Sequence, residues 1–231
     1  MLPSWVDWSF VAAFAGAWPA YDNFVRLPRV KVAILAGASR IREYRFTMLQ
    51  EWLLVAIALV LVIFSGRSWA SVGLVLPHGA GVPWTIGIVL AVAALLKLQY
   101  GAATRTDRAR ASVSRQLAPV RWFLPSAGPE LANFRALSVT AGVCEEILFR
   151  GYLMAFLLPL GGMGVAVVVS SLLFGLGHAY QGVGGAVKAG VIGALMAGMY
   201  LLTGSLLAPI LVHAVVDWSS GQLAADVPAA A

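Results

Sequence analysis

Long apolar runs dominate the pattern of hydrophobic and polar positions along the chain. Two segments, Thr47–Phe64 and Val82–Leu98, each contain a long uninterrupted apolar run. A helix needs about 20 mostly apolar residues to cross the hydrocarbon core of a bilayer, so each segment predicts a transmembrane helix. A third run, Trp5–Tyr21, predicts another. Its aromatic residues are of the kind that gather at membrane interfaces: Trp5, Trp8, Trp18 and Tyr21.

Four further apolar segments follow in the second half of the chain. The predicted spans are Leu131–Leu158, Met163–His178, Ala186–Leu202 and Leu206–Trp218. Short connections that contain Gly or Pro, at 159–162, 181–185 and 203–205, join them, so we expect the four helices to pack as one bundle. The pattern predicts an all-α fold, a polytopic transmembrane bundle of about seven helices with a C-terminal core of four helices.

One predicted helix carries small residues at every fourth position. These are Ala186, Gly190, Ala194 and Gly198. Small residues on one face let membrane helices approach closely, so the spacing predicts a packing face without a catalytic role.

The composition supports the membrane assignment. Hydrophobic residues make up 60% of the chain and charged residues only 11%, against about 25% charged residues in soluble domains. This excludes a disordered chain and an ordinary water-soluble core. The single cysteine, Cys144, cannot form an internal disulfide, which excludes a disulfide-stapled secreted scaffold.

The net charge of +6 comes from basic residues that concentrate between predicted spans. One group is Arg26, Arg29, Lys31, Arg40, Arg42 and Arg45, and the other is Arg105, Arg108, Arg110, Arg115 and Arg121. The loop between them, 65–81, holds only Arg67. The positive-inside rule places both basic loops in the cytoplasm, beside anionic lipids, and the N-terminus outside. The charge therefore reflects membrane orientation, and nucleic-acid binding is not expected.

The N-terminus and the overall composition predict the location further. No positive residue precedes the first apolar run, so a cleavable signal peptide is not expected. The richness in Ala, Gly and Val is typical of a GC-rich prokaryote, which predicts a multi-pass protein of the prokaryotic plasma membrane.

Ionisable residues inside the last four predicted spans are the candidates for chemistry. The candidates among them are Glu145, Glu146, Arg150, His178, His213 and Asp217. A charged group at mid-membrane costs several kcal/mol, so each needs a partner, a wet cavity or a function. Lys188 lies near a predicted helix end, from which its side chain reaches the interface.

Helical spacing assigns different surroundings to the two adjacent glutamates. Glu146 and Arg150 are four residues apart and face nearly the same way, which predicts an ion pair. Glu145 points about 100° away and lacks that cation. His178 follows Phe174 by four residues, and His213 precedes Asp217 by four.

This residue set suits the activation of water. A carboxylate in a low-dielectric site acts as a general base, a neighbouring histidine shares the proton, and further His or Asp groups stabilise an oxyanion. The same types of residue also bind Zn²⁺ through His nitrogens and a carboxylate oxygen, with one position left for water. Both schemes lead to attack of water on an amide carbonyl.

The three segments resemble the motifs EExxxR, FxxxH and HxxxN or HxxxD of the CPBP family. This family comprises CAAX proteases and bacteriocin-processing enzymes, also called Abi proteins. Glu145, Glu146 and Arg150 match the first motif, Phe174 and His178 the second, and His213 and Asp217 the third. The resemblance covers roughly residues 130–220. It implies an intramembrane endopeptidase with the fold of the type II prenyl-protein protease, whose substrate is a hydrophobic or lipidated peptide, for example a prenylated CAAX-like segment.

The resemblance also implies roles. The first motif glutamate, Glu145, activates water with help from His178. His213 and Asp217 stabilise the oxyanion or complete the site, while Arg150, paired with Glu146, organises it. Members have been described both as metalloproteases and as metal-independent glutamate enzymes. In a metalloprotease, Glu145, His178 and His213 would hold Zn²⁺.

The resemblance leaves one residue's role open and implies a division of the chain. Asp217 stands where many members have Asn, so it donates to the oxyanion, orients His213 or favours a metal. The chain divides into N-terminal helices with basic loops (1–130), the catalytic helix core (131–220) and a short tail (221–231).

Other functions fit the sequence less well. The sequence contains no HExxH, GxSG or GxGD motif, which disfavours other types of intramembrane protease. Buried Glu, His and Asp also build relays in ion-coupled transporters, but no inverted repeat is apparent. A non-enzymatic membrane scaffold or immunity factor is the remaining alternative. Cys144 has no cation to stabilise a thiolate and is not expected to be a nucleophile.

Overall fold

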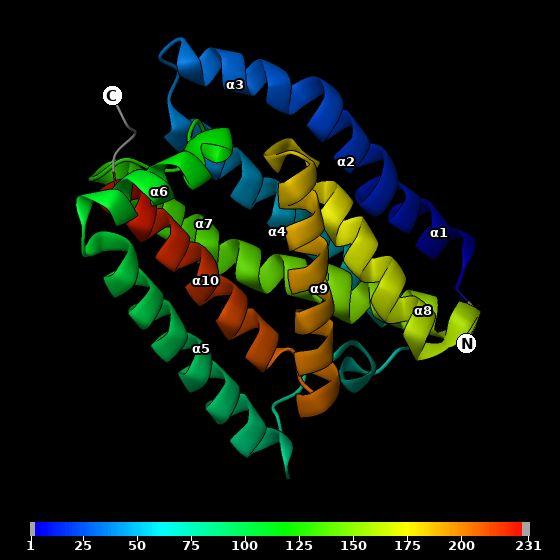
Figure 1. The fold of residues 1–231 in the computed structure, drawn as a ribbon. Coiled ribbons are helices and arrows are strands. Elements are labelled where there is room, and N and C mark those ends of the chain that lie inside the picture. The colour runs from blue at the N-terminus through cyan, green and yellow to red at the C-terminus, as the bar shows by residue number, and fades with distance from the viewer. Residues whose placement is uncertain (1–2, 228–231) are drawn as a thin grey trace.

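The computed structural model describes residues 3–227, and within that range it contains helices and no strand (Figure 1). The first helices are α1 (Trp5–Val11), α2 (Trp18–Tyr21) and α3 (Leu27–Leu35). Two π-helical segments, Ala12–Ala17 and Asp22–Arg26, join them without a break. Residues 5–35 therefore form one long N-terminal rod.

Seven further α-helices follow in the described range. They are α4 (Arg40–Phe64), α5 (Gly81–Thr104), α6 (Asp107–Leu117), α7 (Pro129–Glu145), α8 (Met154–Gly177), α9 (Val183–Thr203) and α10 (Leu207–Asp226). A π-helix, Glu146–Leu153, connects α7 and α8. Gly162 interrupts α8 with a non-helical φ of 75°, at the predicted connection 159–162. In the described range, the rod, α4, α5, α7, α8, α9 and α10 are the seven long helices, which confirms the prediction of about seven.

Several helices extend beyond the apolar runs that predicted them. The rod continues to Leu35, and α4 begins at Arg40 rather than Thr47. The last helix ends at Asp226 rather than Trp218, so much of the predicted tail is helical. Polar residues continue a helix where it leaves the apolar layer. Arg121 donates to the carbonyls of Ala224 (2.8 Å) and Val227 (3.0 Å) at the end of α10.

Within residues 3–227, four helical segments are long and apolar enough to cross a membrane. They are Arg40–Phe64, Gly81–Thr104, Pro129–Gly177 and Val183–Thr203. The third contains two of the predicted spans. The first and last predicted spans are not among these four. Long apolar helices with exposed side chains, such as Leu90 and Leu95 on α5, indicate a multi-pass integral membrane protein.

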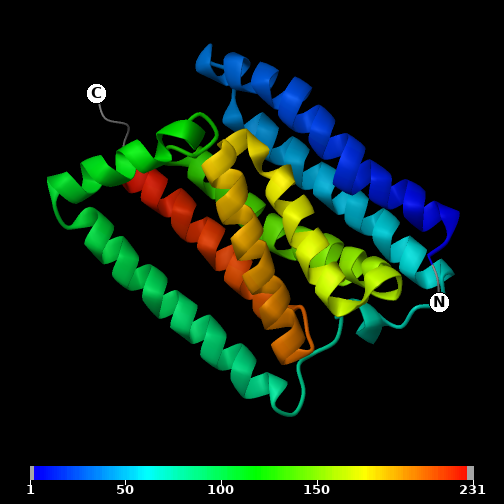
Figure 2. The ribbon, with the colours of Figure 1, turned by 45° about the vertical axis from the view of Figure 1, so that its right-hand side comes forward.

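Helix α7 lies at the centre of the bundle, packed against α4 on one side and α10 on the other. The rod forms one flank of the molecule and α5 the opposite flank (Figures 1 and 2). A Cβ atom on Gly142 of α7 would lie 2.8 Å from the backbone N of Ala214 on α10. The two helices therefore approach as closely as their backbones allow.

Helices α8 and α9 also pack closely, but not through the whole predicted row of small residues. A Cβ atom on Gly175 would lie 2.7 Å from the carbonyl O of Ala186 and 3.1 Å from the backbone N of Gly190. Ala194 and Gly198 are exposed, so the prediction is wrong for this half of the row. Four residues advance a helix by about 40° more than one full turn, so a strict spacing of four drifts off the contact face.

The two basic segments lie at the same end of the molecule, where the turn after α3 approaches α6 (Figure 1). Arg40 donates to the carbonyl O of Trp122 at 2.8 Å and lies 3.3 Å from the carboxyl group of Glu130. The basic loops predicted to share one side of the membrane therefore meet in space.

Because α7 and α10 approach closely, an added methyl group at their contact should destabilise the protein, whereas one at an open position should not. Gly142→Ala should lower the midpoint of thermal unfolding in detergent, because overpacking costs about 1–3 kcal/mol. The matched control is Gly198→Ala on α9, where an added Cβ meets nothing within 4 Å. Alanine also has the higher helix propensity, so this control should be neutral or stabilising. Equal effects of both substitutions would contradict the packing.

Candidate active site

The first motif lies where α7 passes into the π-helix. Glu145 is the last residue of α7, and Glu146 and Arg150 belong to the π-helix Glu146–Leu153, whose residues are all buried. π-Helical turns often occur at functional sites. Arg150 Nη1 lies 3.0 Å from Glu146 Oε1, which confirms the predicted ion pair.

Glu146 is the centre of a fully buried polar cluster. Its side chain is 0% exposed and that of Arg150 is 1% exposed. The same Glu146 Oε1 that pairs with Arg150 also accepts a hydrogen bond from His213 Nδ1 at 2.8 Å. A buried carboxylate is stable only when it is paired and hydrogen-bonded. This contact joins the first motif on the π-helix to the third motif on α10.

The hydrogen bond to Glu146 determines how the His213 ring is presented. A carboxylate only accepts, so His213 Nδ1 carries a proton and Nε2 faces the other acidic residues. Nε2 lies 3.8 Å from Glu145 Oε2 and 3.6 Å from Asp217 Oδ2. Both are ion-pair distances rather than hydrogen bonds. Three carboxyl groups therefore surround one imidazole.

Phe174, from the second motif, packs between residues of all three motifs. The guanidinium carbon of Arg150 lies 4.2 Å from the centre of the Phe174 ring, a cation–π contact. The ring centres of His178 and His213 lie 4.6 Å and 6.0 Å away. A Cβ on Gly193 of α9 would lie 3.0 Å from Arg150 Nη2, so a glycine here leaves room for the guanidinium group.

His178 is oriented by its own helix. It follows α8 directly, and its Nδ1 lies 2.8 Å from the carbonyl O of Phe174. A carbonyl oxygen only accepts, so Nδ1 donates, and Nε2 of the neutral ring keeps a free lone pair. Asn23 of the rod donates to the carbonyl of Gly177 at 3.2 Å, which ties the rod to this turn.

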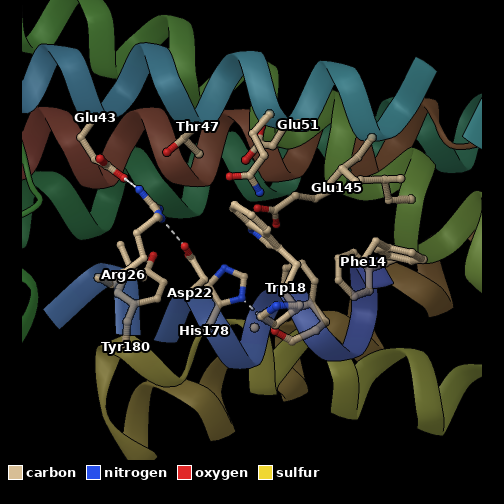
Figure 3. Close-up of a pocket in the computed structure, with 18 of the residues that line it drawn as sticks. Phe14, Trp18, Asp22, Arg26, Glu43, Thr47, Glu51, Glu145, His178 and Tyr180 are labelled. Atoms are coloured by element: carbon tan, nitrogen blue, oxygen red, sulfur yellow. Dashed lines mark hydrogen bonds and ion pairs between the residues drawn. The ribbon is translucent and has the colours of Figure 1, made fainter. Parts of the chain in front are cut away.

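Glu145 and His178 line one pocket, which is enclosed by the rod, α4 and the motif helices (Figure 3). The pocket has a volume of about 160 Å³, enough for several water molecules. Buried Glu145 Oε2 and Trp18 Nε1 lack a hydrogen-bond partner in the described structure. The predicted separation of the two glutamates is therefore observed: Glu146 is enclosed in the ion pair, and Glu145 faces open space.

Tyr180 lies at the same pocket, in the short helix Ala179–Gln181 that follows α8. Burial raises the pKa of its hydroxyl, which therefore stays protonated at neutral pH. The hydroxyl accepts a hydrogen bond from Gln181 Nε2 at 3.2 Å, so its own proton is available for a further acceptor.

The residues predicted for a metal site do not form one. In the described part of the chain, no three His, Cys, Asp or Glu side chains are grouped so that they hold a metal ion. Glu145 lies near His213, whereas His178 is oriented by the carbonyl group of Phe174. We derive no step that uses Zn²⁺ from this arrangement.

The sequence interpretation missed the acidic residues that α4 contributes to the pocket. Glu51 is 7% exposed and lines the pocket together with Glu43, which pairs with Arg26 of the rod. Asp22 pairs with Arg26 from the rod itself. The position of Glu51 within the predicted span Thr47–Phe64 is the signal that could have identified it, because ionisable residues at membrane depth are functional candidates by default.

Residues 127–219 match a family model described as type II CAAX prenyl endopeptidase Rce1-like. The matched region contains all three motifs, so the resemblance stated from the motifs is confirmed. Residues 127–219, less than half of the chain, are therefore similar to an Rce1-like CAAX endopeptidase domain. No curated protein and no solved structure matches the chain.

The buried ion pair predicts a non-additive effect on stability. Arg150→Met leaves the Glu146 carboxylate without its cation and should lower the free energy of unfolding by about 3–5 kcal/mol. The double variant Glu146→Gln/Arg150→Met removes both charges and should recover part of this loss. Denaturant unfolding in detergent of the two single variants and the double variant measures the coupling. Additive losses would contradict a direct pair.

Proposed function

We propose that the protein is an intramembrane endopeptidase that hydrolyses a peptide bond in a hydrophobic or lipidated substrate. The observation that carries the proposal is that Glu145 and His178 line one pocket and Glu145 Oε2 has no hydrogen-bond partner in the described structure, while Glu146 is held in the ion pair. A partly enclosed pocket with a general base and room for water is the minimum that amide hydrolysis requires.

In the proposed reaction, water lies between Glu145 and His178. Glu145 accepts one proton of the water and His178 Nε2 accepts a hydrogen bond from the other, which aims the oxygen at the carbonyl carbon. The new C–O bond gives a tetrahedral oxyanion. Glu145 then returns its proton to the amide nitrogen as the C–N bond breaks, so the products are a carboxylic acid and an amine.

His213 is the proposed oxyanion stabiliser. Its Nδ1 is engaged by Glu146, so a proton on Nε2 is the donor for the developing charge. Asp217, 3.6 Å from Nε2, supports the protonated ring and orients it. Arg150 acts indirectly, because it holds Glu146 and thereby the His213 ring.

The apolar residues that line the pocket favour an apolar substrate. Phe14 of the rod, Leu54 of α4 and Phe149 of the π-helix line it beside Glu145. Such a surface favours a hydrophobic or lipidated peptide, and prenylated CAAX-like segments belong to this class. The lipid bilayer is the medium through which such a substrate reaches the site.

The meeting of the basic segments supports a location and an orientation. Loops rich in Arg and Lys face the cytoplasm, so the end formed by α6 and the turn after α3 is the proposed cytoplasmic end. The loop 65–81 and the N-terminus then lie outside. With the Ala- and Gly-rich composition, we place the protein in the plasma membrane of a prokaryote.

Replacement of Glu145 tests the proposed chemistry. Glu145→Gln keeps the shape of the side chain but removes the base, so kcat on a panel of lipidated and hydrophobic peptides should fall by about 10²–10⁴-fold. The control is Asp107→Asn, which neutralises an exposed carboxylate on α6 and should cleave like the wild type.

The outcomes separate the competing functions. Cleavage by Glu145→Gln at the wild-type rate would overturn the role of Glu145. Ion-dependent solute uptake by vesicles that contain the wild type, without peptide hydrolysis, would identify a transporter. Biological activity that survives Glu145→Gln at normal protein levels, again without hydrolysis, would identify a scaffold.

Cysteine labelling tests the orientation. Ala70 in the loop 65–81 and Gln116 on α6 are exposed, whereas the native Cys144 is fully buried and serves as the blank. A membrane-impermeant maleimide should label Ala70→Cys in intact cells and Gln116→Cys only after permeabilisation. The reverse pattern would show that the N-terminus is cytoplasmic.

A further inference from the structure

Helix α4 carries a polar stripe through its otherwise apolar sequence. Glu43, Thr47 and Glu51 recur at intervals of four residues, and all three line the pocket together with Gln50. The spacing keeps them on one face of the helix. Polar side chains at membrane depth are costly unless they face a wet cavity or a partner. This stripe therefore belongs to the pocket, although α4 lies outside the matched region 127–219.

Among these residues, Glu51 is the buried carboxyl group without a partner. Glu43 has Arg26, whereas Glu51 makes no hydrogen bond or ion pair in the described structure, and its buried Oε2 is unsatisfied. The charged groups that act on it are Glu145, Asp217 and His213. Only the histidine is able to carry a positive charge, and it is already surrounded by carboxyl groups.

Glu51 and Glu145 face the same space from two neighbouring helices. Figure 3 shows both carboxyl groups pointing into the pocket, Glu51 from α4 and Glu145 from α7. Each has a buried Oε2 without a hydrogen-bond partner. Two ionised carboxylates in one low-dielectric pocket repel each other, whereas a protonated carboxyl group beside an ionised one supplies an O–H donor to an acceptor.

We propose that Glu51 is a positioning residue of this site: its protonated carboxyl group donates a hydrogen bond to the Glu145 carboxylate, directly or through one water, and so orients the base toward the attacking water. The proposal rests on the proposed function, since it gives Glu51 a role only through Glu145. No proton is gained or lost by Glu51 in the reaction, because it remains a donor throughout.

Two substitutions of Glu51, each by a side chain of similar length, distinguish a hydrogen-bond donor from a second general base. Glu51→Gln keeps a donor at the same position and should retain kcat within about fivefold of the wild type. Glu51→Met has an unbranched side chain of similar length with no donor, and its kcat should fall by about 10–100-fold with KM little changed, as expected for a lost hydrogen bond to a charged group. Both are assayed on the peptide panel with the full chain in detergent.

The unfolding midpoint of the same variants distinguishes positioning from a structural role. Replacement of an unsatisfied buried carboxyl group by an apolar side chain is neutral or stabilising, so Glu51→Met should unfold at or above the wild-type temperature while its kcat falls. A fall in kcat that follows a fall in the unfolding temperature would overturn the proposal. So would wild-type kcat in Glu51→Met, or a loss in Glu51→Gln as large as that in Glu145→Gln.

Comparison of the Glu145 and Glu51 variants distinguishes failure of the endopeptidase assignment from failure of the role proposed for Glu51. If Glu145→Gln is inactive while Glu51→Met and Glu51→Gln cleave normally, the endopeptidase assignment stands and only the role of Glu51 fails. If Glu145→Gln cleaves normally, the proposed function itself fails, whatever the Glu51 variants do.

Discussion

The buried carboxylate of Glu146 is the constraint on which the site depends. It lies in a medium that does not stabilise an isolated charge, so Arg150 and His213 must both reach it. Arg150 comes from the same helical turn, but His213 comes from α10. The contact sets the register between the π-helix and α10, and the close approach at Gly142 permits it.

The same contact gives two adjacent glutamates different surroundings. Glu146 uses its charge to hold the helices together, and Glu145, about a quarter-turn away, stays free to face the pocket. Phe174 extends the arrangement to the second motif, because its ring lies against the Arg150 guanidinium and its carbonyl orients His178. The three motifs thus form one packed unit rather than three separate sites.

The N-terminal part of the chain completes this unit. The rod supplies Trp18 and Phe14, and α4 its polar stripe, to the pocket that Glu145 also lines. Tyr152 of the π-helix donates to Asp7 of the rod at 2.7 Å, and Asn23 donates to the end of α8, so the rod is held at two points along its length. Most of the residues that line the pocket therefore lie outside the region that carries the motifs.

The sequence by itself determined the helices, the Glu146–Arg150 pair and the motif residues, because apolar runs and the spacing of 3.6 residues per turn are local properties. It did not determine the full length of α4 and α10, which continue as helices beyond the apolar layer. Three features could be seen only in the tertiary structure. Glu51 and Glu145 share a pocket, and His213 rather than His178 contacts Glu146. Half of the small-residue row on α9 is exposed. These features depend on how helices distant in sequence pack together. The periodicity of one helix does not predict which side chains of another helix it will contact.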